Sequence, residues 1–187
     1  MAITLDGTSG ITTPGVVGNL SVSGNTTVGG TLVNTGLITA SAGVAIGGVG
    51  AANTLDDYEE GTYTVTMTHA SGSSTLNSSQ NLLGYVKVGN LVTISGQIQI
   101  QSSNGTGQMH LTLPFAANTT SGESSYFGTG IVRLYGYTFP SGAAYFVCHV
   151  DSANLMTVRG VQDGGATVEL PGQSSGYIMF GMSYRAA

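Results

Sequence analysis

The chain has 187 residues, a net charge of −5 at pH 7 and only four Lys or Arg residues, so we expect no nucleic-acid partner, because phosphate binding requires clustered cations. Charged residues make up 7% of the chain and the mean hydropathy is +0.21, which excludes the low hydrophobicity and high charge of a disordered protein. The single cysteine, Cys148, excludes an intrachain disulfide and suits synthesis in a reducing cytoplasm.

Residues 1–17 are expected to form an attachment segment at the N-terminus. They combine a short strand pattern with a turn-rich join at Pro14–Gly15, and they precede a repeat. This end lacks the basic and apolar regions of a secretory signal, and the chain contains no run of about 18 apolar residues. We therefore expect neither conventional secretion nor membrane insertion.

Residues 18–52 carry a repeat of six residues, marked by glycines at Gly18, Gly24, Gly30 and Gly36. Because six is even and is not a multiple of 3.6, the third and fifth positions of each repeat return to one side of a β-strand, not of a helix. Most of these positions are apolar. The residues predicted to form the stem are Leu20, Val22, Val28, Leu32, Asn34, Ile38, Val44 and Ile46.

These eight residues are called the hexad stripe below. One narrow strand cannot bury such a stripe, because a single chain offers no second layer for it to pack on. The stripe therefore predicts copies of this chain wound around a common axis as a fibrous, β-stranded stem. Asn34 interrupts the apolar positions and predicts a polar layer at that axis.

Residues 53–61 form an acidic junction between the stem and the rest of the chain. Thr54 followed by Asp57 is similar to a helix capping box, which predicts one helical turn before Gly61. Carboxylates repeated around an axis could bind a cation, but their spacing matches no calcium loop and surface carboxylates are usually solvated. We therefore expect no metal site and no cofactor.

Residues 62–187 are predicted to form an all-β head, a β-sandwich of the jelly-roll kind. Short segments with apolar residues at alternate positions recur about every 8 to 12 residues, and no helical stretch interrupts them. The clearest alternation lies in residues 91–101. There Val92, Ile94, Ile98 and Ile100 point to one side, and Gln97, Gln99 and Gln101 point to the other.

The sequence contains no nucleophile elbow, no zinc-peptidase motif and no phosphate-binding loop. Cys148 and His149 are adjacent in a predicted strand, so their side chains leave opposite faces and cannot act as nucleophile and base. Cys148 is expected in the core, and His69, His110 and His149 are expected as hydrogen-bonded strand residues. We expect no enzymatic activity, although the fold could still bring together a carboxylate pair of the glycosidase kind.

Tyr126, Tyr135 and Tyr137 are candidates for contact with a receptor. Tyrosine offers a flat apolar face and a hydroxyl at little entropic cost, which suits stacking on sugars. Tyr135 and Tyr137 are expected to share a solvated strand face with Arg133. The alternative is that these rings pack in the core or between copies of the chain.

Three segments are distinctive: Leu5–Gly15, Asn53–Tyr63, and Gly84–Val92 with Leu113–Phe115 downstream. Together they resemble fibre and tail-fibre proteins of tailed bacteriophages. This resemblance implies a homotrimeric virion fibre that is assembled in the cytoplasm of the host bacterium. It also implies that the N-terminus docks on another virion protein, that the stem trimerises and that the β-domain faces the host cell.

The function expected from the stem and the resemblance together is adhesion, by a tail fibre whose head binds a glycan or a protein on the host surface. The short stem leaves open a capsid-mounted head fibre, or a decoration protein that cements capsid subunits. A virion-associated glycan hydrolase is a third alternative.

Overall fold

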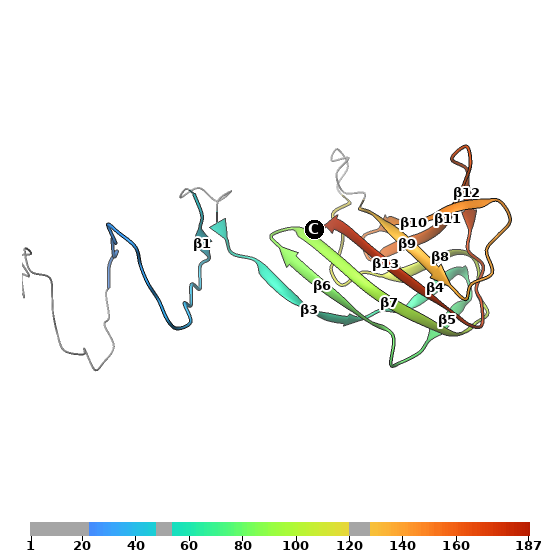
Figure 1. Cartoon of the computed structure of the whole chain (residues 1–187), viewed down its shortest axis with the longest axis horizontal. Helices are drawn as coiled ribbons and strands as arrows, with labels where there is room; N and C mark the ends of the chain where they lie inside the picture. Colours follow the sequence, from blue (N-terminus) through green and yellow to red (C-terminus); the bar gives the residue numbers. More distant parts are fainter. Residues whose placement is uncertain (1–22, 48–53, 120–127) are drawn as a thin grey trace, which may run out of the picture. The chain divides into compact units, whose positions relative to one another are not determined.

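Figure 1 shows a computed structural model of the chain, which describes residues 23–47, 54–119 and 128–187. The chain divides into two compact units, Met1–Thr39 and Ala40–Ala187. Every regular element within the described ranges is a β-strand, so the prediction of an all-β protein is confirmed. Among these residues no helix is long and apolar enough to cross a membrane.

The strands of the described residues all belong to the second unit. Their bounds are β1 Val44–Ala45, β2 Thr54–Leu55, β3 Tyr58–Thr64, β4 Met67–Ser71, β5 Ser73–Leu76, β6 Leu82–Val88, β7 Leu91–Ser103, β8 Thr106–Thr112, β9 Thr129–Tyr135, β10 Ala143–Ser152, β11 Leu155–Gln162, β12 Thr167–Glu169 and β13 Gly176–Arg185.

Eight of these strands close into a barrel, in the order β4, β5, β7, β13, β9, β10, β11, β8 and back to β4. Closure depends on β13, which pairs with β7 along one edge and with β9 along the other (Figure 1). A closed ring leaves no unpaired sheet edge among its members. The structure therefore differs from the predicted β-sandwich, because one continuous hydrogen-bonded ring takes the place of two separate sheets.

The long strand β7 also connects β6 and β3, which lie outside the ring, to the barrel. Its first part pairs with β6 and its last part pairs with β5 on the same edge, and β3 continues the sheet beyond β6. Between the two parts lies Gly96, with a φ of +151°. A Cβ at this position would lie 2.7 Å from Leu83 Cδ2, so glycine lets the fully buried Leu83 pack against the backbone of β7.

Side chains alternate between core and solvent along the barrel strands, as predicted. On β7 the four aliphatic residues Val92, Ile94, Ile98 and Ile100 are at most 1% exposed, whereas the glutamines between and beyond them face outwards. On β13 the residues that face the core are Ile178, Phe180, Met182 and Tyr184. Burial of these apolar faces stabilises the barrel by roughly 25 cal/mol per Å² removed from water.

The predicted helical turn in the acidic junction is wrong. Thr54–Leu55 forms β2, which pairs antiparallel with β1, and β3 begins at Tyr58 and runs straight through Gly61. Strand β3 pairs residue by residue with β6 over its whole length. A non-local ladder of this kind supplies more backbone hydrogen bonds than one helical turn could, so it outweighs the local capping pattern.

Ile178 is fully buried on β13, so replacing it tests whether the inward face of this strand forms part of the core. Ile178→Ala should lower the free energy of unfolding by about 2–5 kcal/mol, because it removes buried methyl groups and leaves a cavity. The matched control is Ile131→Ala on β9, where the side chain is 83% exposed and a change of at most about 0.5 kcal/mol is expected. Urea unfolding followed by circular dichroism measures both variants, and equal losses would contradict this assignment of core and surface.

Candidate functional site

The described part of the hexad stripe is exposed to solvent in the single chain. Leu20 and Val22 lie outside the described residues, as do residues 1–17 of the expected attachment segment. The exposed fractions of the other apolar members are 47% for Val28, 69% for Leu32, 64% for Ile38, 49% for Val44 and 62% for Ile46. Full burial of such a side chain is worth about 1.5–3 kcal/mol, so a surface that covered the stripe would bind it favourably.

Exposure alone does not distinguish the stripe from its neighbours, because Val33 and Leu37 are 79% and 93% exposed. Spacing distinguishes it, since its members recur on one side of an extended chain. Asn34 donates from Nδ2 to the carbonyl of Gly36 at 2.5 Å, a contact within the single chain. Among residues 23–47 only β1 is a regular strand, because a lone segment has no neighbour with which to form a ladder.

The three tyrosines named as receptor contacts have different surroundings. Tyr126 lies outside the described residues, and Tyr135 is 58% exposed at the end of β9. Tyr137 is only 7% exposed; its hydroxyl donates to the carbonyl of Pro171, and burial raises its pKa. The expected alternation fails at Gly136, whose φ of +64° turns the chain so that Tyr137 enters the core.

Tyr135 lies beside a second aromatic ring that the sequence did not single out. The ring centroids of Tyr135 and Tyr177 are 6.0 Å apart, and both rings line a shallow outer cleft of about 270 Å³. Gln80, Gln97 and Met179 complete its lining. The outward position of Tyr177 could have been inferred from alternation, but its neighbours could not, because they depend on which strands pair.

The acidic junction is partly neutralised within the chain. Three of its four carboxylates have a donor: Asp57 pairs with Lys87, Glu59 accepts from the Tyr85 hydroxyl at 2.5 Å, and Glu60 accepts from the Tyr58 hydroxyl at 2.6 Å. Within the described ranges no three His, Cys, Asp or Glu side chains gather as metal ligands would. The carboxylates of the junction therefore make contacts within β3 and between neighbouring segments of the sheet.

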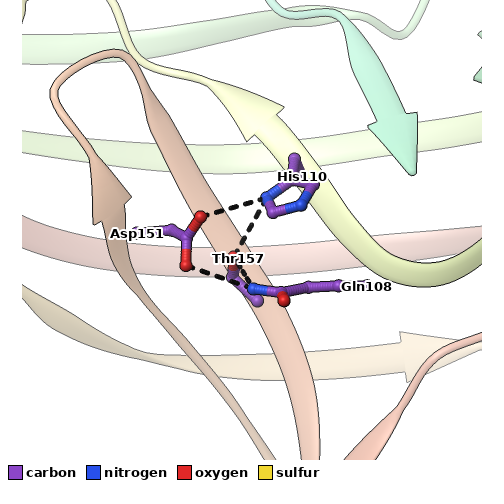
Figure 2. Close-up of polar contacts among 4 residues, drawn as sticks. All are labelled: Gln108, His110, Asp151 and Thr157. Atoms are coloured by element: carbon purple, nitrogen blue, oxygen red, sulfur yellow. Dashed lines mark hydrogen bonds and ion pairs between the residues drawn. The ribbon is translucent and has the colours of Figure 1, made fainter. Parts of the chain in front are cut away.

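Figure 2 shows a polar cluster on the outer surface of β8, β11 and β10. Gln108 Nε2 donates to Thr157 Oγ1 at 2.8 Å and to Asp151 Oδ1 at 3.2 Å. His110 Nδ1 lies 3.1 Å from Thr157 Oγ1 and 3.6 Å from Asp151 Oδ2. Thr157 points away from the core, yet it has 0% exposure because these side chains cover it.

The residue types of this cluster are those of a nucleophile, a base and an acid, but the geometry does not fit that use. In a catalytic triad the imidazole joins the nucleophile through one nitrogen and the carboxylate through the other. Here Thr157 and Asp151 both lie at Nδ1 of His110, and the Thr157 hydroxyl is closed to solvent. The arrangement ties three adjacent strands together and gives a substrate no access to the hydroxyl.

Cys148 and the remaining histidines agree with strand alternation. Cys148 has 0% exposure, and burial raises the pKa of its thiol to about 12, so it is unreactive at neutral pH. His149 leaves the opposite face of β10, and burial is the main cause that lowers its pKa. His69 is 7% exposed, its Nε2 lies 2.9 Å from Ser74 Oγ, and the backbone of Gly105 covers its ring.

Replacing Thr157 tests whether the cluster stabilises the barrel. Thr157→Val keeps the shape but removes the hydroxyl that bonds Gln108 and His110, so the free energy of unfolding should fall by about 1 kcal/mol. Thr68, which pairs with His110 across β4 and β8, is exposed and serves as the matched control. Chemical unfolding of both valine variants measures the difference, and an unchanged Thr157→Val protein would show that the cluster adds nothing to stability.

The buried His69 predicts a dependence of stability on pH. Burial lowers its pKa in the folded state below the ordinary 6.5, so the unfolded chain takes up a proton first. Stability that is present above about pH 6.5 should therefore be lost as the pH falls towards the lowered pKa. The urea midpoint is measured at about pH 7.5 and about pH 5.5. It should fall more between these two pH values for the native protein than for His69→Gln. Equal falls would contradict this role of His69.

Comparison with known proteins adds a relationship at the level of fold. No family model and no curated protein matches the chain. A solved structure that it resembles is the crystal structure of the Dettilon tailspike protein, with 23% identity and a TM-score of 0.52 over 68% of this chain. The matched region makes up 24% of that chain, so about two thirds of this protein corresponds to about a quarter of the tailspike chain. At this identity the similarity shows a shared all-β fold.

Proposed function

We propose that the protein is a structural fibre of a tailed-bacteriophage virion, a homotrimer whose C-terminal barrel adheres to the host surface. The observation that carries this proposal is an exposed hexad stripe joined to a barrel whose fold resembles part of a tailspike protein. The similarity of the opening, junction and head segments to phage fibre proteins points the same way. A tail fibre is the specific form that we propose.

Trimer formation is the step that gives the stripe a function. The side chains of Leu32 and Ile38, exposed in the single chain, would face the same residues of two other copies around an axis. Burying each of them stabilises the assembly by about 1.5–3 kcal/mol per chain. Three barrels on one stem then act together, and multivalency raises affinity by about 10² to 10⁴ without any single tight site.

The remaining partners in the proposal are those that the resemblance to phage fibre proteins implies. Residues 1–17 dock on another virion protein, and the barrel contacts a glycan or a protein of the host cell. Assembly takes place in the cytoplasm of the host bacterium. A reducing compartment suits this chain, because its single cysteine, Cys148, is a buried free thiol. Adhesion requires no catalytic step, so the proposal includes no enzymatic activity.

Two leucines of the stem test the trimer and the adhesion together. Leu32 belongs to the hexad stripe, whereas Leu37 is even more exposed, at 93%, and lies off the stripe. Leu32→Ser should dissociate the trimer or lower its melting temperature, because it removes about 1.5–3 kcal/mol of apolar burial per chain. Leu37→Ser should leave the trimer intact. Native mass spectrometry and thermal unfolding measure the assembly.

The same proteins are then used to compete with phage adsorption to the host strain. The native protein and Leu37→Ser should inhibit adsorption, whereas Leu32→Ser should inhibit it at least tenfold less, because avidity is lost. A monomeric native protein, or equal behaviour of the two variants, would contradict the stem. Gold labelling on the capsid would favour a decoration protein, and release of reducing ends from host polysaccharide would favour a hydrolase.

A further inference from the structure

The strands β7, β13 and β9 lie side by side (Figure 1). Six of their outward-facing residues form a two-by-three grid. One row joins Gln97, Met179 and Arg133, and the next row joins Gln99, Tyr177 and Tyr135. We call this grid the tyrosine–glutamine face. Because it is built on paired strands of a closed barrel, its side chains are held in fixed relative positions.

A short loop fixes one side of this face. The Asn77 N–H donates to the Gln99 carbonyl at 2.9 Å, and the Gln99 N–H donates to the Gln80 carbonyl at 3.1 Å. Side chains repeat the connection, since Asn77 Nδ2 donates to Gln99 Oε1 at 2.7 Å and Gln97 Nε2 donates to Gln80 Oε1 at 3.2 Å. The loop and the edge of β7 therefore form one polar wall beside the aromatic rings.

The face combines the groups that a sugar ring requires. The planes of Tyr135 and Tyr177 are tilted by 43°, and Tyr135 is 58% exposed, so an apolar ring surface with hydroxyl edges faces solvent. Each amide side chain has two donor hydrogens and an acceptor oxygen with two lone pairs. The bond between Gln97 and Gln80 and the bond from Asn77 to Gln99 orient these amides, which keep further donors and acceptors for the hydroxyls of a ligand.

Arg133 adds a cation at the border of the face. Its side chain is exposed, Nη1 lies 3.9 Å from Met179 Sδ, and no carboxylate of the described residues forms an ion pair with it. A guanidinium in this setting recognises a carboxylate or a phosphate through charge-assisted hydrogen bonds. The cleft of about 270 Å³ lies just below the usual range of roughly 300–1,000 Å³ for ligand sites, which suits one sugar unit of a longer glycan.

We propose that the tyrosine–glutamine face binds one unit of a bacterial surface saccharide, with an acid group of that unit at Arg133. The inference rests on the proposed adhesion and names the ligand class and the contact residues for it. Tyr135 and Tyr177 pack against the sugar ring, and the glutamine amides bond its hydroxyls. Weak binding at one face becomes effective because the trimer presents three.

The test uses the full-length protein on an array of bacterial O-antigen and capsular polysaccharides that includes neutral and acidic glycans. The native protein should bind at least one acidic polysaccharide. Tyr135→Ala and Tyr177→Ala should each reduce that binding at least tenfold, and the phenylalanine variants should keep most of it, because they retain the ring. Arg133→Gln should reduce binding to acidic glycans and leave neutral ones unchanged.

The matched control is Tyr145→Ala on β10, since Tyr145 is 55% exposed and lies outside the face. This variant should bind as the native protein does, and unfolding midpoints establish that all variants are folded. Binding to no polysaccharide, or binding that survives both tyrosine-to-alanine changes, would overturn the proposal. Dissociation of the trimer by those changes would overturn it too, because the face would then be a contact between copies.

Failure of this inference is distinguishable from failure of the proposed function. If the native protein competes with phage adsorption and both tyrosine-to-alanine variants compete equally well, the face is not the binding site and adhesion stands. If the native protein neither forms trimers nor competes, the proposed function itself is wrong. The array and the competition assay therefore give separate results.

Discussion

The pairing of β13 along both of its edges is the interaction on which the rest of the barrel depends. Every residue from Gly176 to Arg185 has a partner in β7, and Tyr177 to Ser183 also have partners in β9. Backbone groups on both edges are thereby satisfied, and the inward side chains of β13 lie in the core. Without this strand β7 and β9 would each present an open edge, and the ring would become an open sheet.

The same pairing explains how far the fold could be predicted from the sequence. Alternation along a strand is a local property, so the inward side of β7 and the opposite faces of Cys148 and His149 were predicted correctly. Ring closure depends on which distant strands meet, and a sandwich and a barrel require the same alternation. The helical turn near Thr54 failed for the same reason, because the ladder between β3 and β6 is not visible in a local pattern.

The candidate sites show the same division between local and non-local information. A repeat of six residues identifies the hexad stripe, because the spacing itself carries the signal. Tyr135 was predicted as a receptor contact from its residue type and is exposed, but Tyr137 was misplaced, since the left-handed backbone at Gly136 ends the alternation. The partners of Tyr135 are Tyr177 from β13 and Gln80 from a loop, and only the register of three strands brings them together.

Because the chain carries little charge, the proposed adhesion depends mainly on short-range contacts between neutral groups. Only 7% of the residues are charged, and apart from Arg133 the tyrosine–glutamine face consists of two aromatic rings, two neutral amides and the thioether of Met179. Salt screens exposed charges over about 8–10 Å at moderate ionic strength, but it hardly affects stacking or hydrogen bonds between neutral groups. Contacts of this kind act only at short range and add little individually. A rigid barrel fixes such contacts in register, and the proposed trimeric stem would present three copies of them, so both features compensate for weak binding at a single site.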